Sequence, residues 1–290
     1  MKGIILSGGS GSRLYPITLS ISKQIIPIYD KPMIYYPLSV LMLSGIKDIM
    51  IITNKEHIEI FKKQLGDGSS LGIKISYEIQ KKPNGIPEAF LIAEKFINNQ
   101  NVLLILGDNL FYGQQLGSLL KKSFNKSAGA KIFLHQVKNP NEYGVVEFNK
   151  IKKIKKIVEK PKNFVSNYAV TGMYLFDQKV VSLTKKLKPS KRNELEITDL
   201  LNLYLKKNKL SYEILGRGHT WFDAGTHDSL LSASQFIKAV EDRQGFKIGC
   251  IEEIAYANKW INNLKLKKFV LKYRNSPYGN YLKNIPNINN

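Results

Sequence analysis

The chain has 290 residues, of which 43% are hydrophobic and 23% charged, and its formal net charge at pH 7 is +21. This is a globular composition with no apolar run of about 18 residues that could span a membrane, and the single cysteine, Cys250, excludes an internal disulfide or a zinc site of several thiolates. Only five of the 44 basic residues are arginines and the lysines are spread along the chain, so we expect a solvated lysine surface rather than a nucleic-acid partner.

Apolar runs that predict strands alternate along the chain with segments that predict helices. The expected strands span 3–7, 46–53, 73–80, 101–106, 130–137, 144–148, 168–177 and 210–215. The expected helices span 32–44, 55–65, 87–98, 115–126, 178–187, 196–207 and 226–241. Continuous apolar strands are typical of sheets covered on both faces. The pattern therefore predicts an α/β fold, a Rossmann-like and mostly parallel mixed sheet flanked by helices.

The chain is expected to form one main α/β domain over 1–241. Its first part, about 1–137, carries most of the strand–helix alternation, and about 138–177 is an insertion with short strands that carries a second subsite. Residues 242–290 are expected to form a C-terminal helical extension. The first strand begins directly after Met1-Lys2, which leaves no room for a signal peptide, so we expect a cytoplasmic protein without membrane attachment.

The first expected strand ends in a glycine-rich loop. Gly8, Gly9 and Gly11 are followed by Ser12 and Arg13. Glycines let the backbone approach a ligand closely, consecutive N–H groups form an anion cradle, and an arginine adds a fork of donors. The loop lacks the lysine of a P-loop and the third glycine of a dinucleotide fingerprint. It predicts a phosphate site of another kind, the alternative being an ordinary strand-to-helix turn.

Polar residues also follow later strands, at the sheet edge where α/β proteins bind ligands. Gln80 ends one strand, and Asp108 and Asn109 follow the most apolar strand. A carboxylate there is costly unless it is solvated, paired or bound to a metal, and magnesium takes one or two carboxylates together with phosphate oxygens. Asp223, between aromatic residues and a helix start, is a second candidate ligand, although it can equally cap that helix.

Two charged motifs complete the candidate site. Lys23, next to Gln24, lies close to the glycine loop in sequence, where a lysine is either a phosphate ligand or a surface residue. Glu159 and Lys160 precede a proline turn and can hold sugar hydroxyls and a phosphate, the alternative being a surface ion pair.

Read together, these residues identify a family. The chain resembles the sugar-1-phosphate nucleotidyltransferases in GGSGSRLYPIT…SKQIIPIYDKPMIYYPLSVLMLSGI, LGDNLFYG, EYGVVEF, EKP, SNYAVTGMYLFD, ELEITDLL, GRGHTWFDAGTHDSLL and EDRQGFKI. The likeness covers nearly the whole chain and is greatest to members that act on dTTP and α-D-glucose 1-phosphate. It implies formation of dTDP-glucose and pyrophosphate, the first step of dTDP-L-rhamnose and other dTDP-sugar synthesis for bacterial surface polysaccharide. The alternatives are UTP or another sugar phosphate as substrate, or a non-catalytic relative that binds nucleotide sugars.

The resemblance also implies a role for each candidate residue. The nucleotide-binding positions are Gly8, Gly9, Gly11, Ser12, Arg13, Lys23, Gln24, Gln80, Gly85 and Asp108. The sugar-phosphate positions are Asn109, Gly144, Glu159, Lys160 and Val170. Asp108 and Asp223 are the implied Mg²⁺ ligands. Catalysis is expected from Arg13, Lys23, Asp108, Lys160 and Asp223.

The family further implies a homotetramer with a second, regulatory site for a thymidine nucleotide, to which Arg217 is a candidate contributor. The chain departs from the family pattern at two places. Ser12 stands where threonine is usual. The loop 80–88 reads QKKPNGIPE where relatives read closer to QPSPDGLAQ, with Asn84 in place of aspartate and with Pro87 and Glu88 unusual, so we expect any change in substrate preference to originate in this loop.

Overall fold

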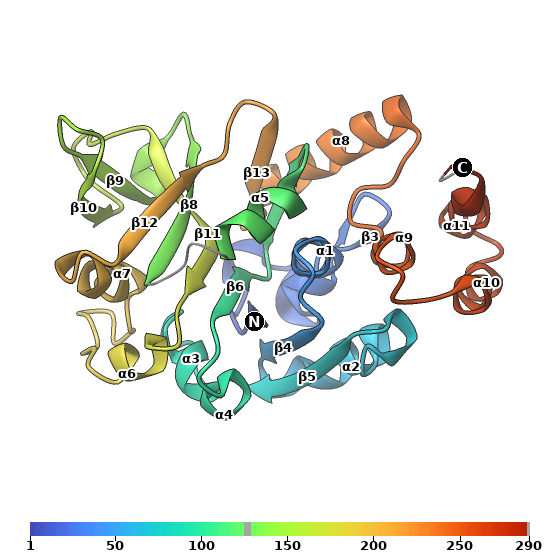
Figure 1. The fold of residues 1–290 in the computed structure, drawn as a ribbon, viewed down its shortest axis with the longest axis horizontal. Helices are drawn as coiled ribbons and strands as arrows, with labels where there is room; N and C mark the ends of the chain where they lie inside the picture. The colour runs from blue at the N-terminus through green and yellow to red at the C-terminus, as the bar shows by residue number, and fades with distance from the viewer. Residues whose placement is uncertain (125–128, 289–290) are drawn as a thin grey trace.

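A twisted central sheet organises the computed structural model, which describes residues 1–124 and 129–288 (Figure 1). Its parallel core runs in the order β6 (Val102–Leu106), β1 (Lys2–Ser7), β4 (Asp48–Thr53) and β5 (Lys74–Ile79). β11 (Tyr168–Phe176) joins β6 antiparallel and continues the sheet into its second half. The expected α/β class with a mostly parallel, mixed sheet is therefore confirmed.

The second half of the sheet is antiparallel where it leaves the core. β8 (Ala130–Gln136) pairs with β11, and β12 (Leu210–Ile214) runs parallel to β8. β9 (Gly144–Phe148) touches β11 and forms a hairpin with β10 (Ile154–Glu159), a strand that the sequence pattern did not predict. A bulge between Val170 and Tyr174 bends β11 where the two halves meet. The residues of the expected insertion are thus part of the main sheet, and the division at 138–177 stays a prediction.

Two smaller pairings lie outside the main sheet. β7 (Asn109–Gly113) and β13 (His219–Asp223) form an antiparallel ribbon, and β2 (Pro27–Ile28) pairs with β3 (Lys31–Pro32). These four strands were not expected from the sequence. The β7–β13 ribbon starts directly after Asp108 and ends at Asp223, so it places the two candidate metal ligands next to each other.

Both faces of the parallel core are buried. Neighbouring side chains along each strand point to opposite sides of the sheet, so each strand contributes to two hydrophobic cores. Ile5, Leu103 and Ile105 belong to a core on one face, whereas Ile4 and Leu104 belong to a core on the other. The first core contains α1 (Tyr35–Leu43), α5 (Leu116–Phe124) and α9 (Ile251–Ala257). The second contains α3 (Glu88–Ile92), α6 (Val180–Thr184) and α7 (Ile197–Lys206). The core strands are continuously apolar in sequence because helices cover the sheet on both faces.

Most expected helices are present with shifted bounds, and most of them are shorter than expected. α2 spans Ile58–Leu65, α8 spans His227–Gln244, and the segment 87–98 divides at Ala93 into α3 and α4 (Glu94–Ile97). The last two residues of the expected helix 115–126 lie outside the described residues. α1 is apolar on every side and is buried between the sheet and α9. In the described ranges, no helix is both long and apolar enough to cross a membrane.

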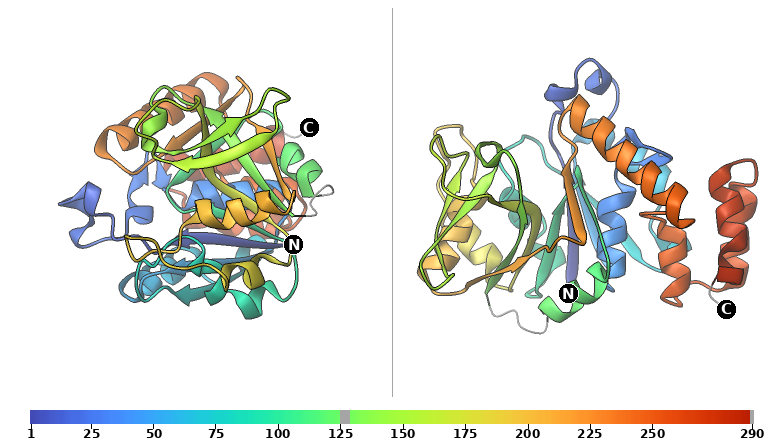
Figure 2. Two further views of the ribbon diagram at one scale, coloured as in Figure 1. Left: turned by 90° about the vertical axis from the view of Figure 1, so that its left-hand side faces the viewer. Right: turned by 90° about the horizontal axis from the view of Figure 1, so that it is seen from above.

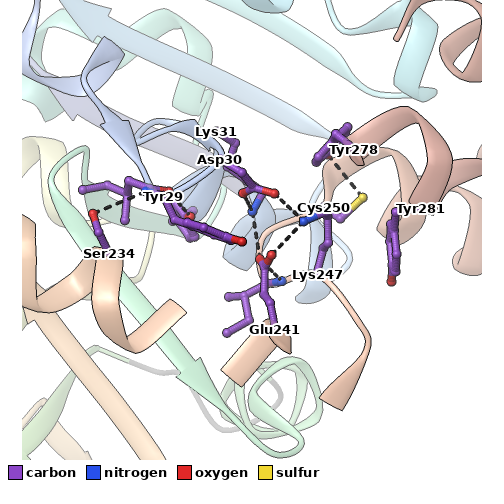
Figure 3. A network of polar contacts seen from close by, with 12 residues as sticks. Tyr29, Asp30, Lys31, Ser234, Glu241, Lys247, Cys250, Tyr278 and Tyr281 are labelled. Atoms are coloured by element: carbon purple, nitrogen blue, oxygen red, sulfur yellow. Dashed lines mark hydrogen bonds and ion pairs between the residues drawn. The ribbon is translucent and has the colours of Figure 1, made fainter. Parts of the chain in front are cut away.

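The C-terminal segment forms α9, α10 (Asn263–Lys272) and α11 (Pro277–Ile288), at the opposite end of the molecule from the β9–β10 hairpin (Figure 2). A partly buried charge network ties it to the segment after the glycine loop (Figure 3). The ammonium of Lys31 pairs with Asp30 and with Glu241 at 3.0 Å. Glu241 also accepts from Lys247 at 2.8 Å and from the backbone N–H of Ile248 at 2.9 Å. The helical extension is therefore present, while its boundary at residue 242 stays a prediction.

Candidate functional site

The candidate site lies at the carboxyl ends of the parallel strands. In register, Leu6 of β1 is paired with Leu106 of β6, and Thr53 of β4 with Ile79 of β5. The chain leaves these strands together, and the N–H of Gly107 donates to the carbonyl of Leu6 at 2.8 Å. The structure therefore brings the glycine loop, Gln80 and Asp108 to one sheet edge, as the sequence predicts.

The glycine loop has a tight geometry that its residue types explain. Gly11 has φ of 67°, a left-handed conformation that favours glycine. Its carbonyl accepts from the Thr18 hydroxyl at 2.7 Å, and Ser12 then opens a single 3₁₀ turn. A Cβ placed on Gly8 would lie 2.2 Å from Gln80 Oε1, whereas a Cβ on Gly9 would meet no described atom within 4 Å. One side of the loop thus packs against the Gln80 amide, and the other is open for a ligand.

Two carboxylates converge where the β7–β13 ribbon meets the sheet. Asp223 lies opposite Asn109 in register, and the N–H of Ala224 donates to the carbonyl of Asp108 at 2.9 Å. Asp108 forms an ion pair with the buried Lys23, and Asn109 Nδ2 donates to its other oxygen at 2.8 Å. The sequence-predicted pair of metal ligands is therefore brought together, with Lys23 beside it.

The two carboxylates have opposite pKa shifts. Burial alone raises the pKa of Asp108, but the charge of Lys23 and the hydrogen bonds from Lys23 and Asn109 outweigh it, so this pKa lies below its usual value. Burial and the neighbouring Asp108 charge raise the pKa of Asp223 to about 6, against the lowering effect of Lys23, Arg13 and Lys160. Three cationic side chains thus act on one carboxylate pair.

Arg13 reaches this pair from the glycine loop. A Cβ placed on Gly225 would lie 2.9 Å from Arg13 Nη2 and 3.1 Å from Asp223 Oδ1. The guanidinium and the carboxylate therefore border the same small space, which only a glycine leaves open. Arg13 is exposed, so its donors are accessible to an anionic ligand.

The donor set fits a hard divalent cation. Asp108 and Asp223 offer carboxylate oxygens, and Mg²⁺ usually takes one or two carboxylates and completes its shell with water and phosphate oxygens. A cation there would also relieve the repulsion that raises the pKa of Asp223. The described residues contain no group of three or more His, Cys, Asp or Glu side chains suited to a metal, so the fit rests on these two carboxylates.

Gln80 and the loop after it form a second group of contacts. Gln80 is 4% exposed, and its Nε2 donates to Glu88 Oε2 at 2.8 Å and to the carbonyl of Gly85 at 3.4 Å. Asn84 Nδ2 donates to the other Glu88 oxygen at 2.8 Å. Asn84 and Glu88, two of the residues that depart from the family pattern, therefore pair with each other. Gln24, also buried, accepts from Ser22 at 2.8 Å and packs beside Gly107.

Apart from Asn109, the expected sugar-phosphate residues lie on the other half of the sheet. Gly144 is paired with Glu159 between β9 and β10, and a Cβ on Gly144 would approach Glu159 Oε2 to 3.0 Å. The backbone N–H of Lys160 donates to the carbonyl of Tyr143 at 3.0 Å, and its side chain is exposed and can face a ligand. The side chain of Val170 packs in the core, so only its backbone can serve this subsite.

Sequence reasoning missed the residues that hold Asn109 in place. Asn109 Oδ1 accepts from Trp221 Nε1 at 2.6 Å and from the Gly172 N–H at 3.1 Å, and a Cβ on Gly172 would lie 2.4 Å from that oxygen. The position of Trp221 two residues before Asp223, on the same face of a strand, was the available signal. Arg217 is not part of this site, because it precedes the opposite end of β13.

Comparison with known proteins agrees with this geometry. The nucleotidyl transferase family matches residues 2–240. The chain is 53% identical over 282 residues to the glucose-1-phosphate thymidylyltransferase of Neisseria meningitidis serogroup A, and the match covers 97% of this chain and 98% of that one. It is 48% identical to the enzyme of the same name from Mycobacterium tuberculosis, with the same coverage.

Solved structures give the same result. A Bacillus anthracis protein described as a glucose-1-phosphate thymidylyltransferase in complex with sucrose is 45% identical, with a TM-score of 0.76 over 81% of this chain and 94% of that one. A UDP-glucose pyrophosphorylase in complex with UDP-glucose is 27% identical, with a TM-score of 0.72 over 82% and 98%. The chain therefore belongs to the nucleotidyl transferase family, among the glucose-1-phosphate thymidylyltransferases.

Proposed function

We propose that this protein transfers the thymidylyl group of dTTP to α-D-glucose 1-phosphate, giving dTDP-glucose and pyrophosphate. The observation that carries the proposal is the convergence of Arg13, Lys23 and Lys160 on the Asp108–Asp223 pair. Two polyanionic substrates repel each other, and such a cluster of cations at a sheet edge offsets that repulsion.

The proposed reaction requires the protein to position the substrates and neutralise their charge, and it requires no strong base. A phosphate oxygen of glucose 1-phosphate attacks the α-phosphorus of dTTP, the new P–O bond forms, and the bond to the β-phosphate breaks with release of pyrophosphate. The nucleophile is already anionic. The proposed role of Arg13 and the glycine-loop amides is to hold the departing pyrophosphate, and that of Lys23 and Lys160 is to neutralise the α-phosphate and the sugar phosphate.

Asp108 and Asp223 are the proposed ligands of the divalent cation, which we take to be Mg²⁺. When bound, it would supply charge neutralisation at the phosphate oxygens. Asn109, held by Trp221 and Gly172, is proposed to present its amide to the sugar phosphate, with Gly144 and Glu159 on the far side of that subsite.

Pyrophosphate release tests the proposal. The purified protein is assayed with glucose 1-phosphate and Mg²⁺ and with dTTP, UTP, CTP or ATP in turn. We expect the highest kcat/KM with dTTP. A preference for UTP would replace the proposed nucleotide, and no pyrophosphate with any nucleotide would indicate a non-catalytic relative.

The proposed assembly is a homotetramer with a regulatory site for a thymidine nucleotide, separate from the catalytic centre. Arg217 follows Gly216 in the exposed turn between β12 and β13, away from the carboxylate pair, which is compatible with such a separate site. Light scattering of the purified protein tests the assembly. Inhibition by dTDP-sugars that is lost in Arg217→Ala while turnover persists would support the site, and unchanged inhibition would remove Arg217 from it.

A further inference from the structure

We propose that a lysine-lined groove along α7 binds an acidic segment of a partner protein, one that carries apolar side chains between its carboxylates. The groove has a volume of about 660 Å³ and is bordered by β10, by α7 and by the turn that follows α6. Figure 1 shows α7 between β10 and α6, and α7 contacts both. None of the proposed substrate-binding residues lines the groove, so this binding would be separate from nucleotidyl transfer.

Lysines from three separate elements border the groove. In chain order they are Lys155 and Lys156 in β10, Lys186 and Lys188 after α6, and Lys206 at the end of α7. Within the described ranges, only Lys155 among them has an ion pair within 4.0 Å, with Glu147. Asp199 is the one carboxylate that lines the groove among residues 1–124 and 129–288. Ammonium groups gathered without counter-charges repel each other, so an anionic ligand would be attracted to this groove.

A bulge in β10 brings two neighbouring lysines to the groove. Side chains that follow each other along a regular strand point to opposite faces of the sheet. The register between β10 and β9 shifts between Ile154 and Lys156, so Lys155 lies in the irregularity, and both lysines line the groove. Lysines on an edge strand such as β10 commonly prevent pairing with another strand. That role does not account for the lysines on α7 and after α6, which border the same space.

The groove also offers apolar surface beside the lysines. Along α7, Asp199, Asn202, Leu203 and Lys206 follow the three- and four-residue spacing of a single helix face. Leu203 and Leu205 line the groove and are only partly buried. In the described part of the chain, neither is among the side chains of the hydrophobic cores or those packed against them. These two leucines therefore have contact area left for a ligand.

The lining residues favour one class of ligand. Single-stranded nucleic acids usually stack their bases on aromatic rings or arginine planes, and the described lining contains neither. Inorganic polyphosphate has no apolar part for the leucines, and a flat bilayer does not enter a groove. A second copy of this chain would bring a like net charge of +21. An acidic segment with apolar side chains complements both the lysines and the leucines.

Charge reversal at two separate parts of the groove tests the proposal. Lys156→Glu/Lys206→Glu changes β10 and α7, and Lys186→Glu/Lys188→Glu changes the turn after α6. All four side chains are exposed, so we expect both variants to fold. Each should bind a short fluorescent peptide of alternating glutamate and leucine about tenfold more weakly than the wild type at low ionic strength, because two attractive contacts become repulsive. Added salt should weaken wild-type binding as well.

Two controls separate local recognition from net charge. Lys267→Glu/Lys268→Glu changes the net charge equally through exposed lysines of α10, at the other end of the molecule, and should bind the peptide as the wild type does. Leu203→Asn keeps every charge. It should weaken binding of the glutamate–leucine peptide and leave binding of a glutamate–serine peptide unchanged.

Fluorescence anisotropy measures peptide binding to each protein, with inorganic polyphosphate and an oligodeoxyadenylate as competing probes. Thermal unfolding confirms that each variant is folded. Absence of peptide binding to the wild type, equal binding by the groove variants and the α10 control, or equal binding of the serine and leucine peptides would overturn the inference. Preferential binding of polyphosphate or the oligonucleotide through the same lysines would replace the acidic segment by that polyanion. Pyrophosphate release, measured in parallel, should be the same in both groove variants as in the wild type, and its absence in the wild type would refute only the proposed function.

Discussion

The contact between the glycine loop and Gln80 gives a quantitative test of how the site is built. In Gly8→Ala, the added Cβ would meet Gln80 Oε1 at 2.2 Å, while ordinary contacts begin at 3.4 Å. The amide oxygen must therefore withdraw by about 1.2 Å, or the loop must shift by a similar amount. Gln80 is 4% exposed and tied to Glu88, so the flexible end of the side chain is not free to yield.

The magnitude follows from the two ways in which the strain can be relieved. Overpacking of a filled site costs about 1–3 kcal/mol, and loss of the hydrogen bond to the Glu88 carboxylate costs about 1.5–3 kcal/mol. Because relief of the strain by one route lowers the cost of the other, the two costs do not add in full, and we expect about 2–3 kcal/mol of destabilisation. For a chain of 290 residues, that corresponds to a decrease in Tm of roughly 3–5 °C.

Scanning calorimetry measures this decrease, and two variants serve as controls. Gly9→Ala should leave Tm nearly unchanged, because its Cβ meets no described atom within 4 Å. In Gly8→Ala/Gln80→Ala, the nearest remaining atom of residue 80 is Cβ at 3.3 Å, so adding the Gly8 change to Gln80→Ala should cost far less than it does in the wild type. Equal costs in both backgrounds would refute the contact as the cause.

Three further changes test other parts of the molecule. Asp108→Asn should lower kcat by on the order of a hundredfold at saturating Mg²⁺, as loss of a preorganised electrostatic group does; near wild-type turnover would exclude Asp108 as a metal ligand. Arg13→Ala should raise KM for dTTP and lower kcat, whereas a change confined to KM for glucose 1-phosphate would contradict its placement at the nucleotide phosphates. Glu241→Ala leaves the ammonium groups of the buried Lys31 and the partly buried Lys247 with Asp30 alone, so we expect about 3 kcal/mol of destabilisation by denaturant unfolding; a loss below about 1 kcal/mol would show that Asp30 suffices.

The parallel core and the place of the site were predictable because each depends on local signals. Apolar runs such as Val102–Leu106 indicate buried strands, and residues that follow the carboxyl ends of adjacent parallel strands must meet. The glycine loop, Gln80 and Asp108 are such residues. Their meeting needed no knowledge of any side-chain contact.

The rest depended on pairings between segments far apart in the chain. The β7–β13 ribbon consists of two five-residue strands from distant parts of the chain, and neither has a strong pattern of its own. For the same reason, the bond from Trp221 to Asn109 could not be derived from spacing, although both residues stand in recognised motifs. Glu88 was noted only as unusual, because its contacts depend on Gln80 and Asn84 lying on either side of its carboxylate.

The electrostatics of the carboxylate pair are consistent with the proposal that a lysine and a metal ion act together at this site. Lys23 keeps Asp108 ionised, but the Lys23 ammonium and a bound cation would compete for the oxygens of Asp108. Asp223 forms no ion pair within 4.0 Å in the described part of the chain, and its pKa stays raised although three cations act on it from a distance. A divalent ion between the two carboxylates would hold Asp223 ionised and release Lys23 toward a phosphate. The pair is therefore better suited to a cation that arrives with a nucleotide than to a permanent metal centre, for which a third protein ligand would be expected.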